Sequence, residues 1–485
     1  TTPPTTPEHV SAMVRRAAEA GTAWRRSTIF ERVRALGAVA DALDAHADEL
    51  IAEAQRETHL PEPRLRGEVR RTSFQLRLFA EVLEEGTWLD ARIDRADGEW
   101  PMGAPRPDLR RQLEPIGPVL VFAASNFPFA FSVAGGDTAS ALAAGNAVVL
   151  KAHRGHPQLS ARTTTVVQDA LAAAGAPRGL FDTVYGTQAG VQALKDPLIQ
   201  AAAFTGSIAG GRTLFDIAAS RPQPIPFYGE LGSVNPAFVT RSAASERARE
   251  IVDGFVASVT GSAGQLCTKP GVLLVPADSG LDALLAAASL PAPAPLLNDG
   301  IAEGFRGAVE ATASHDAVQV LAGATGTDGD PGPVLLMTTA AALRADHESL
   351  ISEMFGPAAL VATYDEESEM VAVASMLEGQ LTATVVGSEG DAVAAELVPV
   401  LSTKAGRVLW NEWPTGVSVT WAQQHGGPYP ATTAVGTTSV GAAAITRFLR
   451  PVTYQNMPDA LLPPALQASN PLGIPRRIDG ILTAP

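Results

Sequence analysis

Cys267, the one cysteine among 485 residues, lies in the stretch TGSAGQLCTKPGV. A single unpaired thiol is often just a small buried hydrophobic side chain. A cysteine becomes a nucleophile where a positive field, a helix N-terminus or a base favours its thiolate. Gly261 and Gly264 allow unusual backbone conformations and close approach to a ligand. Cys267 is therefore a candidate nucleophile, and its assignment depends on residues elsewhere in the chain.

Two other side chains could complete a site for acyl transfer. Glu230, in PFYGELGSVNP, is a candidate base for a nucleophile or a water, with a solvated or helix-capping acid as the alternative. Asn126, in ASNFPF, could donate its side-chain amide to an oxyanion, with a simple asparagine turn before Pro128 as the alternative. Together with Cys267 they would supply a base, an oxyanion donor and a nucleophile.

The first half of the chain predicts a sheet that could hold such a site. Short apolar runs alternate with helical patterns such as QLSARTTTVVQDALAAAG, which predicts right-handed βαβ crossovers and a mostly parallel sheet. These runs cover residues 118–124, 147–150, 180–185 and 201–205. Ligands of such sheets bind beyond the carboxyl ends of the strands. Polar or glycine residues follow all four runs: Ser125-Asn126, Lys151, Gly186-Thr187 and Gly206-Ser207.

Glycine spacing alone gives only a weak signal for a dinucleotide. The G-x-G-x-x-G fingerprint is absent from this part of the chain, and Gly206-Ser-Ile-Ala-Gly210-Gly211 has a different spacing. Ordinary turns between strand and helix are the alternative.

The remaining segments predict flanking helices and a second α/β block. Residues 8–85 have helical periodicity, and residues 91–108 form a proline-rich loop pattern. From 231 to about 421, strand-like runs recur at 237–240, 271–275 and 358–363, with a glycine-rich loop expected at 323–333. Residues 434–451 mix β-branched residues with a short helix.

Six motifs occur in the order and approximate spacing of the aldehyde dehydrogenase superfamily, which the chain resembles from about residue 114 to 458. They are Asn126-Phe-Pro, Lys151, Phe204-Thr-Gly-Ser207, Glu230-Leu-Gly, Gly264-Gln-x-Cys267 and Glu353-x-Phe355-Gly-Pro. The resemblance implies an α/β fold with a Rossmann-type cofactor domain, an α/β catalytic domain and a small β oligomerisation arm. The expected boundaries are 1–108 and 117–230 for the cofactor domain, 231–430 for the catalytic domain, and 109–116 with 431–485 for the arm and C-terminal segment.

The resemblance also implies roles for the three candidate residues. Cys267 would attack an aldehyde to give a thiohemiacetal, whose oxyanion the Asn126 amide and the Cys267 backbone N–H would hold. Hydride transfer to a nicotinamide would leave a thioester. Glu230 would activate the water that releases the carboxylic acid.

Cofactor contacts follow from the same resemblance. Lys151 would bind the adenosine ribose. Gly206 and Ser207 would meet the pyrophosphate at a helix N-terminus. Glu353 would bind the nicotinamide ribose, with Phe355 packed beside the ring.

Two positions depart from the pattern of many family members. Ser125 stands where many have tryptophan, which changes one pyrophosphate or packing contact. Arg154 stands three residues after the lysine, where many NAD-preferring members have a glutamate that repels a 2′-phosphate. An arginine can pair with phosphate instead, so we expect NADP to be preferred over NAD, with a solvated surface arginine as the alternative.

Longer segments, among them GELGSVNP, SEMFGPA, HGGPYPAT and TTSVGAAAITRFLRPVTYQNMP, are similar to a narrower subgroup. It contains 2,5-dioxopentanoate (α-ketoglutaric semialdehyde) dehydrogenases and NADP-dependent fatty aldehyde dehydrogenases. Either substrate is possible on this basis, and 2,5-dioxopentanoate is our first expectation. Phe127, Phe131, Trp413 and Trp421 are candidate pocket residues, although aromatic side chains are commonly core. His425 is expected to be structural and no metal is expected, because the sequence offers His425 no ligand partners.

Composition narrows the setting of the protein. Acidic residues number 51 against 36 basic ones, and a net charge of −15 repels nucleic acid and anionic membranes. No apolar run approaches the ~20 residues of a membrane helix, and the first residues lack a signal-peptide pattern. We therefore expect a cytoplasmic enzyme with a small-molecule aldehyde substrate and, by resemblance, a homodimer or homotetramer. A cofactor-independent thiol esterase and a noncatalytic protein with this fold are the competing hypotheses.

Overall fold

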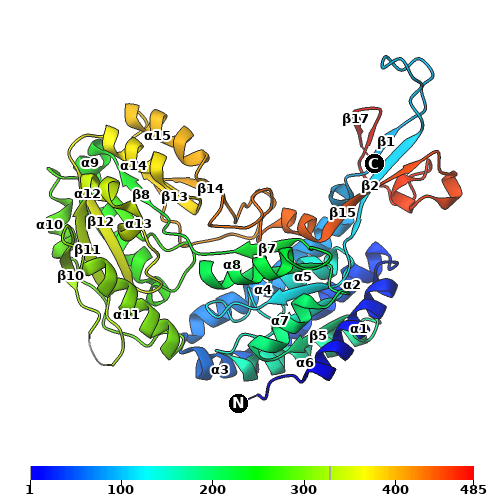
Figure 1. Cartoon of the computed structure of the whole chain (residues 1–485), viewed down its shortest axis with the longest axis horizontal. Coiled ribbons are helices and arrows are strands. Elements are labelled where there is room, and N and C mark those ends of the chain that lie inside the picture. The colour runs from blue at the N-terminus through cyan, green and yellow to red at the C-terminus, as the bar shows by residue number, and fades with distance from the viewer. Residues whose placement is uncertain (1, 327–328, 485) are drawn as a thin grey trace.

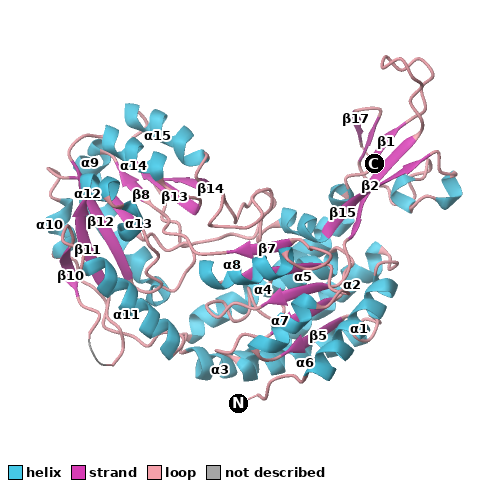
Figure 2. Cartoon of the chain, in the orientation of Figure 1, coloured by secondary structure: helices cyan, strands magenta, loops and turns pink. Residues whose placement is uncertain are grey.

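The computed structural model describes residues 2–326 and 329–484. Residues 327–328 of the expected glycine-rich loop lie outside the described residues. Three β-sheets organise the chain into two α/β lobes and a projecting arm (Figure 1). The two lobes lie side by side, and the arm rises from the lobe that contains the N-terminal helices (Figure 2). The α/β fold class predicted from the sequence is confirmed.

The first lobe is built on a parallel sheet with the order β5-β4-β3-β6-β7. Its strands are β3 (Val119–Phe122), β4 (Val148–Lys151), β5 (Phe181–Val184), β6 (Ala201–Thr205) and β7 (Phe227–Glu230). The strand order reverses beside β3, and ligands of such sheets bind at this kind of switch point. The four predicted strands occur where the apolar runs are, whereas β7 was not expected as a strand.

Helices cover both faces of this sheet. Between its strands the chain forms α5 (Gly136–Ala143), α6 (Pro157–Ala173), α7 (Thr187–Lys195) and α8 (Ile208–Ala219). The predicted N-terminal helices are α1 (Pro7–Trp24), α2 (Ile29–Ala45), α3 (Ala47–Thr58) and α4 (Glu62–Glu85). Their apolar faces share one hydrophobic core with the sheet. Thr28 and Glu31 form a capping box that fixes the start of α2, a device that stabilises a helix end by about 1 kcal/mol.

The second lobe holds a seven-stranded sheet with the order β10-β11-β12-β9-β8-β13-β14, parallel except at the β10 edge. Its strands are β8 (Ala237–Val239), β9 (Val272–Pro276), β10 (Gln319–Gly323), β11 (Val334–Thr339), β12 (Ala358–Tyr364), β13 (Gln380–Val386) and β14 (Ala405–Trp410). Its helices are α9 (Arg241–Thr260), α10 (Leu281–Ala286), α11 (Asp299–Ala313), α12 (Ala340–Ala345), α13 (His347–Leu350), α14 (Ser368–Met376) and α15 (Ala392–Ser402). Separate apolar clusters line the two faces of this sheet.

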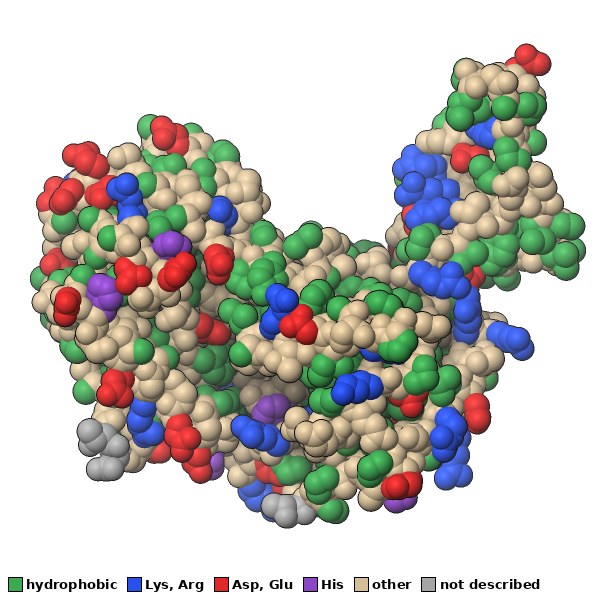
Figure 3. Space-filling model, in the orientation of Figure 1, with side chains coloured by type: hydrophobic (Ala, Val, Ile, Leu, Met, Phe, Trp, Pro, Cys, Tyr) green, Lys and Arg blue, Asp and Glu red, His purple; other side chains and the backbone are tan. Residues whose placement is uncertain are grey.

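The arm is a five-stranded sheet with the order β15-β2-β1-β16-β17. Its strands are β1 (Arg92–Asp94), β2 (Leu109–Pro115), β15 (Leu449–Gln455), β16 (Arg476–Ile478) and β17 (Ile481–Thr483). β1 therefore pairs within the arm although it precedes the expected arm segment 109–116, and the domain boundaries themselves stay a prediction. The short helix expected within 434–451 is a 3₁₀ helix, Ala442–Phe448, directly before β15. Apolar and basic side chains gather on the arm (Figure 3).

No helix within the described ranges is both long enough and apolar enough to cross a membrane.

Candidate active site

Cys267, His425 and Glu230 meet where the two lobes join. The Cys267 Sγ lies 3.5 Å from His425 Nε2, and His425 Nε2 lies 2.8 Å from Glu230 Oε1. Glu230 ends β7 of the first lobe, whereas Cys267 follows α9 of the second. The structure therefore brings together two of the three predicted catalytic residues and adds His425, which we expected to be structural.

Backbone contacts fix the loop that presents Cys267. Gly264 has φ +66°, and a Cβ on this residue would lie 2.1 Å from the carbonyl oxygen of Gly356. Only glycine fits so close an approach in the left-handed region. The Asn235 side-chain amide donates to the carbonyls of Cys267 (2.8 Å) and Lys269 (2.9 Å). The nucleophile loop is thus held against the Glu353-x-Phe-Gly-Pro loop.

Asn126, the third predicted residue, lies beside this loop. It follows β3 and is buried, and its Nδ2 donates to the carbonyl of Gln265 at 3.1 Å. Arg64 Nη2 donates to the Asn126 carbonyl at 2.5 Å, which fixes the backbone of the turn. The Asn126 amide is thus held at Gln265, two residues before Cys267 in the chain. It is a suitable hydrogen-bond donor for the oxyanion that forms when the Cys267 sulfur adds to a carbonyl group.

The charges around Glu230 keep it ionised. Burial favours the neutral carboxyl, but the charge and hydrogen bonding of His425, with the Ser439 hydroxyl, bring the pKa of Glu230 below its usual value. Ser439 Oγ donates to Glu230 Oε2. The buried Arg447 adds a positive charge nearby, and it is itself paired with Asp137. Glu230 is therefore equipped to act as a base.

The thiol, by contrast, is held in its neutral form. Burial first, and then the negative charge of Glu230, raise the pKa of Cys267 well above its usual value. The sulfur is enclosed by protein, although the residue as a whole keeps some solvent exposure. A proton acceptor is consequently needed before Cys267 can attack.

His425 can be that acceptor. His425 Nε2 lies between the two groups, 2.8 Å from Glu230 Oε1 and 3.5 Å from the Cys267 Sγ, so the same ring nitrogen faces both the carboxylate and the thiol. An unprotonated Nε2 can take the thiol proton at 3.5 Å, and the N–H formed in this way can then donate to Glu230 Oε1. The structure supplies the metal-ligand partners that the sequence did not show for His425, since ligand atoms of Glu230, Cys267 and His425 all lie within 4.8 Å of one another. The 2.8 Å contact is nevertheless short for two ligands of one tetrahedral zinc, which stand roughly 3.4 Å apart.

The predicted cofactor residues follow the carboxyl ends of the first sheet. Lys151 ends β4, and its side chain packs against α7 at Gly190. A Cβ atom added to Gly190 would lie only 2.8 Å from Lys151 Cγ. Arg154 is exposed three residues later. Ser207 caps α8 by accepting the N–H of Gly210 at 3.2 Å, which leaves an exposed helix N-terminus that favours an anion. Gly206 precedes it without a side chain that would block approach.

The remaining predicted contacts come from the loops between the lobes. Glu353 lies over Gly232, where a Cβ would be 2.4 Å from Glu353 Oε2. Burial raises the pKa of Glu353 to about 7 and lowers that of the neighbouring Lys269 to about 8. Phe355 and Ser125 are both partly exposed near these loops. Three features fit a dinucleotide: the exposed N-terminus of α8, the two cations Lys151 and Arg154 at the end of β4, and the Glu353 carboxylate over Gly232.

The four candidate pocket residues divide into two groups. Phe127 and Phe131 pack together, with ring centroids 5.4 Å apart, and Phe131 lies 6.2 Å from the His425 ring. Trp413 instead packs on Phe255 of α9, with centroids 5.5 Å apart. Trp421 is 49% exposed. Of the four, Phe127 and Phe131 are connected to the Cys267 site by these contacts, through His425.

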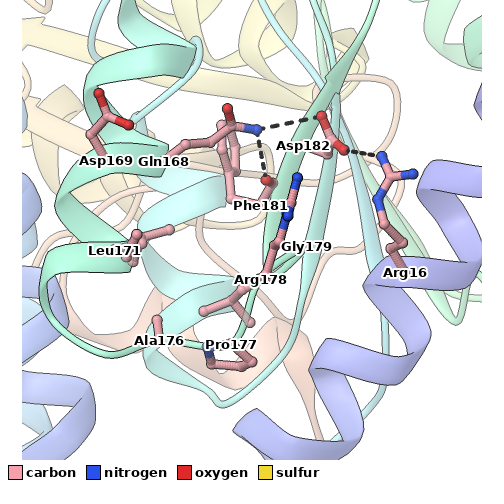
Figure 4. A pocket seen from close by; sticks show the side chains of 12 residues that line it. Arg16, Gln168, Asp169, Leu171, Ala176, Pro177, Arg178, Gly179, Phe181 and Asp182 are labelled. Carbon is pink, nitrogen blue, oxygen red and sulfur yellow. Dashed lines mark hydrogen bonds and ion pairs between the residues drawn. The ribbon is translucent and has the colours of Figure 1, made fainter.

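A surface hollow of about 420 Å³ lies elsewhere, between α1, α6 and the start of β5 (Figure 4). Arg16 and Asp182 form an ion pair of 2.8 Å at its edge. The hollow lies at the amino end of β5, so it is away from the edge of the sheet where cofactors of this fold class bind.

Comparisons with known proteins agree with this geometry. The model of the aldehyde dehydrogenase family matches residues 1–451. The chain is 41% identical to an alpha-ketoglutaric semialdehyde dehydrogenase of Acinetobacter baylyi over 98% of this chain and 92% of the relative. It is 45% identical to alpha-ketoglutaric semialdehyde dehydrogenase 2 of Azospirillum brasilense over 96% of this chain and 90% of the relative.

Solved structures show the same fold at lower identity. A glyceraldehyde-3-phosphate dehydrogenase of Methanocaldococcus jannaschii, complexed with NADP, has a TM-score of 0.80 at 19% identity, covering 94% of this chain and 95% of that one. A putative aldehyde dehydrogenase of Burkholderia cenocepacia has a TM-score of 0.79 at 23% identity, covering 94% and 93%.

Proposed function

This chain belongs to the aldehyde dehydrogenase family, and we propose that it oxidises 2,5-dioxopentanoate to 2-oxoglutarate, with NADP as the preferred hydride acceptor. It is an oxidoreductase that converts an aldehyde to a carboxylic acid. The contact of Cys267 with His425 and Glu230, beside the Asn126 amide, is the observation that supports the assigned roles. The two relatives above 40% identity support the choice of substrate.

The chain's own residues can carry the first half of the reaction. His425 Nε2 takes the proton from Cys267, and the thiolate adds to the aldehyde carbon, forming a C–S bond. The Asn126 Nδ2 donates to the oxygen that becomes negative, as a preorganised donor should. NADP or NAD, when bound by Lys151, Ser207 and Glu353, supplies the acceptor for the hydride that leaves the same carbon.

The second half is hydrolysis of the thioester on Cys267. Glu230 is the base: it takes a proton from water, whose oxygen adds to the thioester carbon. The C–S bond breaks, Cys267 recovers a proton and the carboxylic acid leaves. Ser439 orients the Glu230 carboxylate for this step through its hydrogen bond to Oε2. Family membership favours this reaction over a cofactor-independent thiol esterase.

The preference for NADP is supported by charge at one strand end. Lys151 and Arg154 are two cations within four residues, and no acidic side chain lies between them in the sequence. A 2′-phosphate would find two donors there. Arg154→Glu should lower kcat/KM with NADP by about 10-fold or more relative to NAD, because a charged hydrogen bond is replaced by repulsion. An unchanged NADP to NAD ratio would show that Arg154 is a solvated surface residue.

We also propose that the arm joins two or more copies of this chain in the cytoplasm. Leu461, Ile481 and Leu482 are each more than 60% exposed on the arm, and a grouping of exposed apolar side chains is typical of protein interfaces. Light scattering after gel filtration should give a dimer or tetramer mass, and Ile481→Asp with Leu482→Asp should shift it toward one chain. A wild-type mass of one chain would refute the assembly.

Reduced-nicotinamide absorbance tests the activity directly. The wild type and Cys267→Ser should be assayed with 2,5-dioxopentanoate and hexanal, each with NADP and NAD. We expect a higher kcat/KM for 2,5-dioxopentanoate in the wild type and no turnover in the variant. A higher value for hexanal would establish the fatty aldehyde alternative. No signal for any pair, from folded protein with reduced Cys267, would refute the dehydrogenase itself.

A further inference from the structure

Arg71, Arg407 and Arg447 lie close enough to act on Cys267 or Glu230, and Arg64 contacts the Asn126 turn; these four arginines differ in how their guanidinium groups are used. Arg407 donates to the carbonyls of Gly416 and Pro414, both at 2.7 Å. Arg447 is paired with Asp137. Both of these arginines are therefore occupied by contacts within the protein.

Arg64 and Arg71 lie two turns apart on α4. Arg64 stacks on Phe127, with its Cζ 5.1 Å from the ring centroid, and its Nη2 is bonded to the Asn126 carbonyl. Arg71 stacks on Phe131, with its Cζ 5.2 Å from the ring centroid. Nη1 of Arg64 and Nη1 of Arg71 are both buried without a hydrogen-bond partner among the described residues, but Arg64 already donates through Nη2, whereas the Arg71 guanidinium makes no hydrogen bond in the described part of the chain. Arg71 also forms no ion pair in the described part of the chain.

Glu68, one turn before Arg71, is the main negative charge acting on this guanidinium, but it forms no hydrogen bond or ion pair with it in the described residues. Its Oε1 accepts the N–H groups of Phe129 at 2.8 Å and Ala130 at 2.9 Å, so the carboxylate supports the loop that carries Phe127 and Phe131. No Glu68 oxygen lies within ion-pair distance of Arg71 in the described residues. The buried donor on Arg71 therefore lacks a partner that the protein itself supplies, and an unpaired buried donor is costly.

Arg71 is joined to the nucleophile by a short series of contacts. Its guanidinium covers Phe131, whose ring lies 6.2 Å from that of His425, and His425 contacts Cys267. The charge of Arg71 lowers the otherwise raised pKa of Cys267, so the two groups are within electrostatic range. Arg64 has no such effect on Cys267 among the causes of its shift.

We propose that Arg71 binds the distal carboxylate of the substrate and thereby selects semialdehydes that carry a terminal carboxylate over uncharged aldehydes. In such a substrate, four C–C bonds of about 1.5 Å each separate the aldehyde carbon from the carboxylate carbon. A planar guanidinium can take a carboxylate with two parallel N–H···O bonds. Phe131, beneath the guanidinium, would hold its plane. This inference rests on the proposed substrate class.

The test is a ratio of two activities in matched variants. For wild type, Arg71→Gln and Arg70→Gln, kcat/KM should be measured with 2,5-dioxopentanoate and with hexanal, using one cofactor. Arg70 is the control because it is the neighbouring arginine and is exposed. We expect Arg71→Gln to lower the ratio of the two kcat/KM values about 10- to 100-fold, as loss of a charged hydrogen bond does, and Arg70→Gln to keep it.

Outcomes separate this inference from the proposed function. A wild type that prefers hexanal overturns the proposed substrate and the role of Arg71 with it. A wild type that prefers 2,5-dioxopentanoate, with a ratio in Arg71→Gln within about threefold of wild type, overturns only the role of Arg71. If Arg71→Gln does not fold, Arg71→Lys replaces it: a smaller fall of the ratio supports the proposal, because the charge stays and the paired geometry is lost, and an unchanged ratio refutes it.

Discussion

Replacing His425 with glutamine tests whether this residue takes the thiol proton. Glutamine keeps a polar side chain of similar length but cannot accept a proton at neutral pH. In the wild type, His425 Nε2 lies 3.5 Å from a thiol whose pKa burial and Glu230 hold well above its usual value. Without His425, the remaining candidate acceptor is Glu230, which has a carboxylate oxygen within 4.8 Å of the thiol.

The size of the effect follows from these contacts. A positioned general base contributes about 10²- to 10⁴-fold, which corresponds to about 3 to 5 kcal/mol in the barrier. This loss should appear in formation of the thioester, which a rapid-mixing burst of reduced nicotinamide measures. Alkylation of Cys267 by iodoacetamide, without cofactor, should slow in the same direction because it also needs the thiolate.

The same substitution should change the pH dependence of hydrolysis. His425 is the main group that lowers the pKa of Glu230 against the effect of burial. When His425 is removed, the pKa of Glu230 rises, so the carboxylate is protonated at a higher pH than in the wild type. The acid limb of the steady-state rate should therefore move to higher pH.

His315→Gln is the matched control, since His315 pairs with Asp346 at 3.4 Å in the second lobe and makes no contact with the site. It should leave both the burst and the pH profile as they are in the wild type. A burst and an alkylation rate in His425→Gln within about threefold of wild type would refute the role of His425 as proton acceptor.

Three further predictions concern the surroundings of this contact. Ser439→Ala removes the hydroxyl donor to Glu230, so the pKa of Glu230 should rise and the acid limb of steady-state hydrolysis should move to higher pH; an unshifted pH profile would contradict this. Cofactor affinity, measured by titration calorimetry, should increase from pH 6 to pH 8, because the raised pKa of Glu353, about 7, leaves its carboxyl neutral at the lower pH and therefore a weaker acceptor for ribose hydroxyls. Glu353→Gln should remove that dependence, and a dependence that persists would assign it to another group. Dialysis against EDTA should leave activity unchanged, since Glu230 and His425 are separated by a contact distance of 2.8 Å that is too short for shared zinc ligation; loss of activity restored by a metal would refute this.

The sequence predicted the parts of the fold that depend on local pattern. Buried parallel strands require continuous apolar runs, so β3, β4, β5 and β6 coincide with the runs read from the sequence. β7 was missed because its four residues, Phe-Tyr-Gly-Glu, combine a glycine with an acid and match no buried-strand pattern. The α/β fold and the family membership are both confirmed.

The part of the site that escaped prediction depends on contacts between distant segments. His425 is 158 residues from Cys267, and Ser439 is 209 residues from Glu230, so no local spacing links them. The HGGPYP segment was noted in the sequence, but the groups that His425 contacts are the Cys267 thiol and the Glu230 carboxylate, which belong to two distant segments. Asn235 lay within the GELGSVNP motif already noted, and its role in holding the nucleophile loop required the structure. The catalytic roles themselves stay predictions.

The neutral state of the resting thiol has a consequence for survival of the enzyme under oxidative stress. Peroxide attacks the thiolate, and a cysteine kept protonated by its surroundings is oxidised slowly. The chain has no second cysteine with which a sulfenic acid on Cys267 could form an internal disulfide. Protonation thus protects the Cys267 sulfur from oxidation, and the sulfur becomes reactive when His425 accepts its proton. Inactivation by hydrogen peroxide should accordingly be slow at neutral pH and accelerate as the pH rises toward the raised pKa of Cys267.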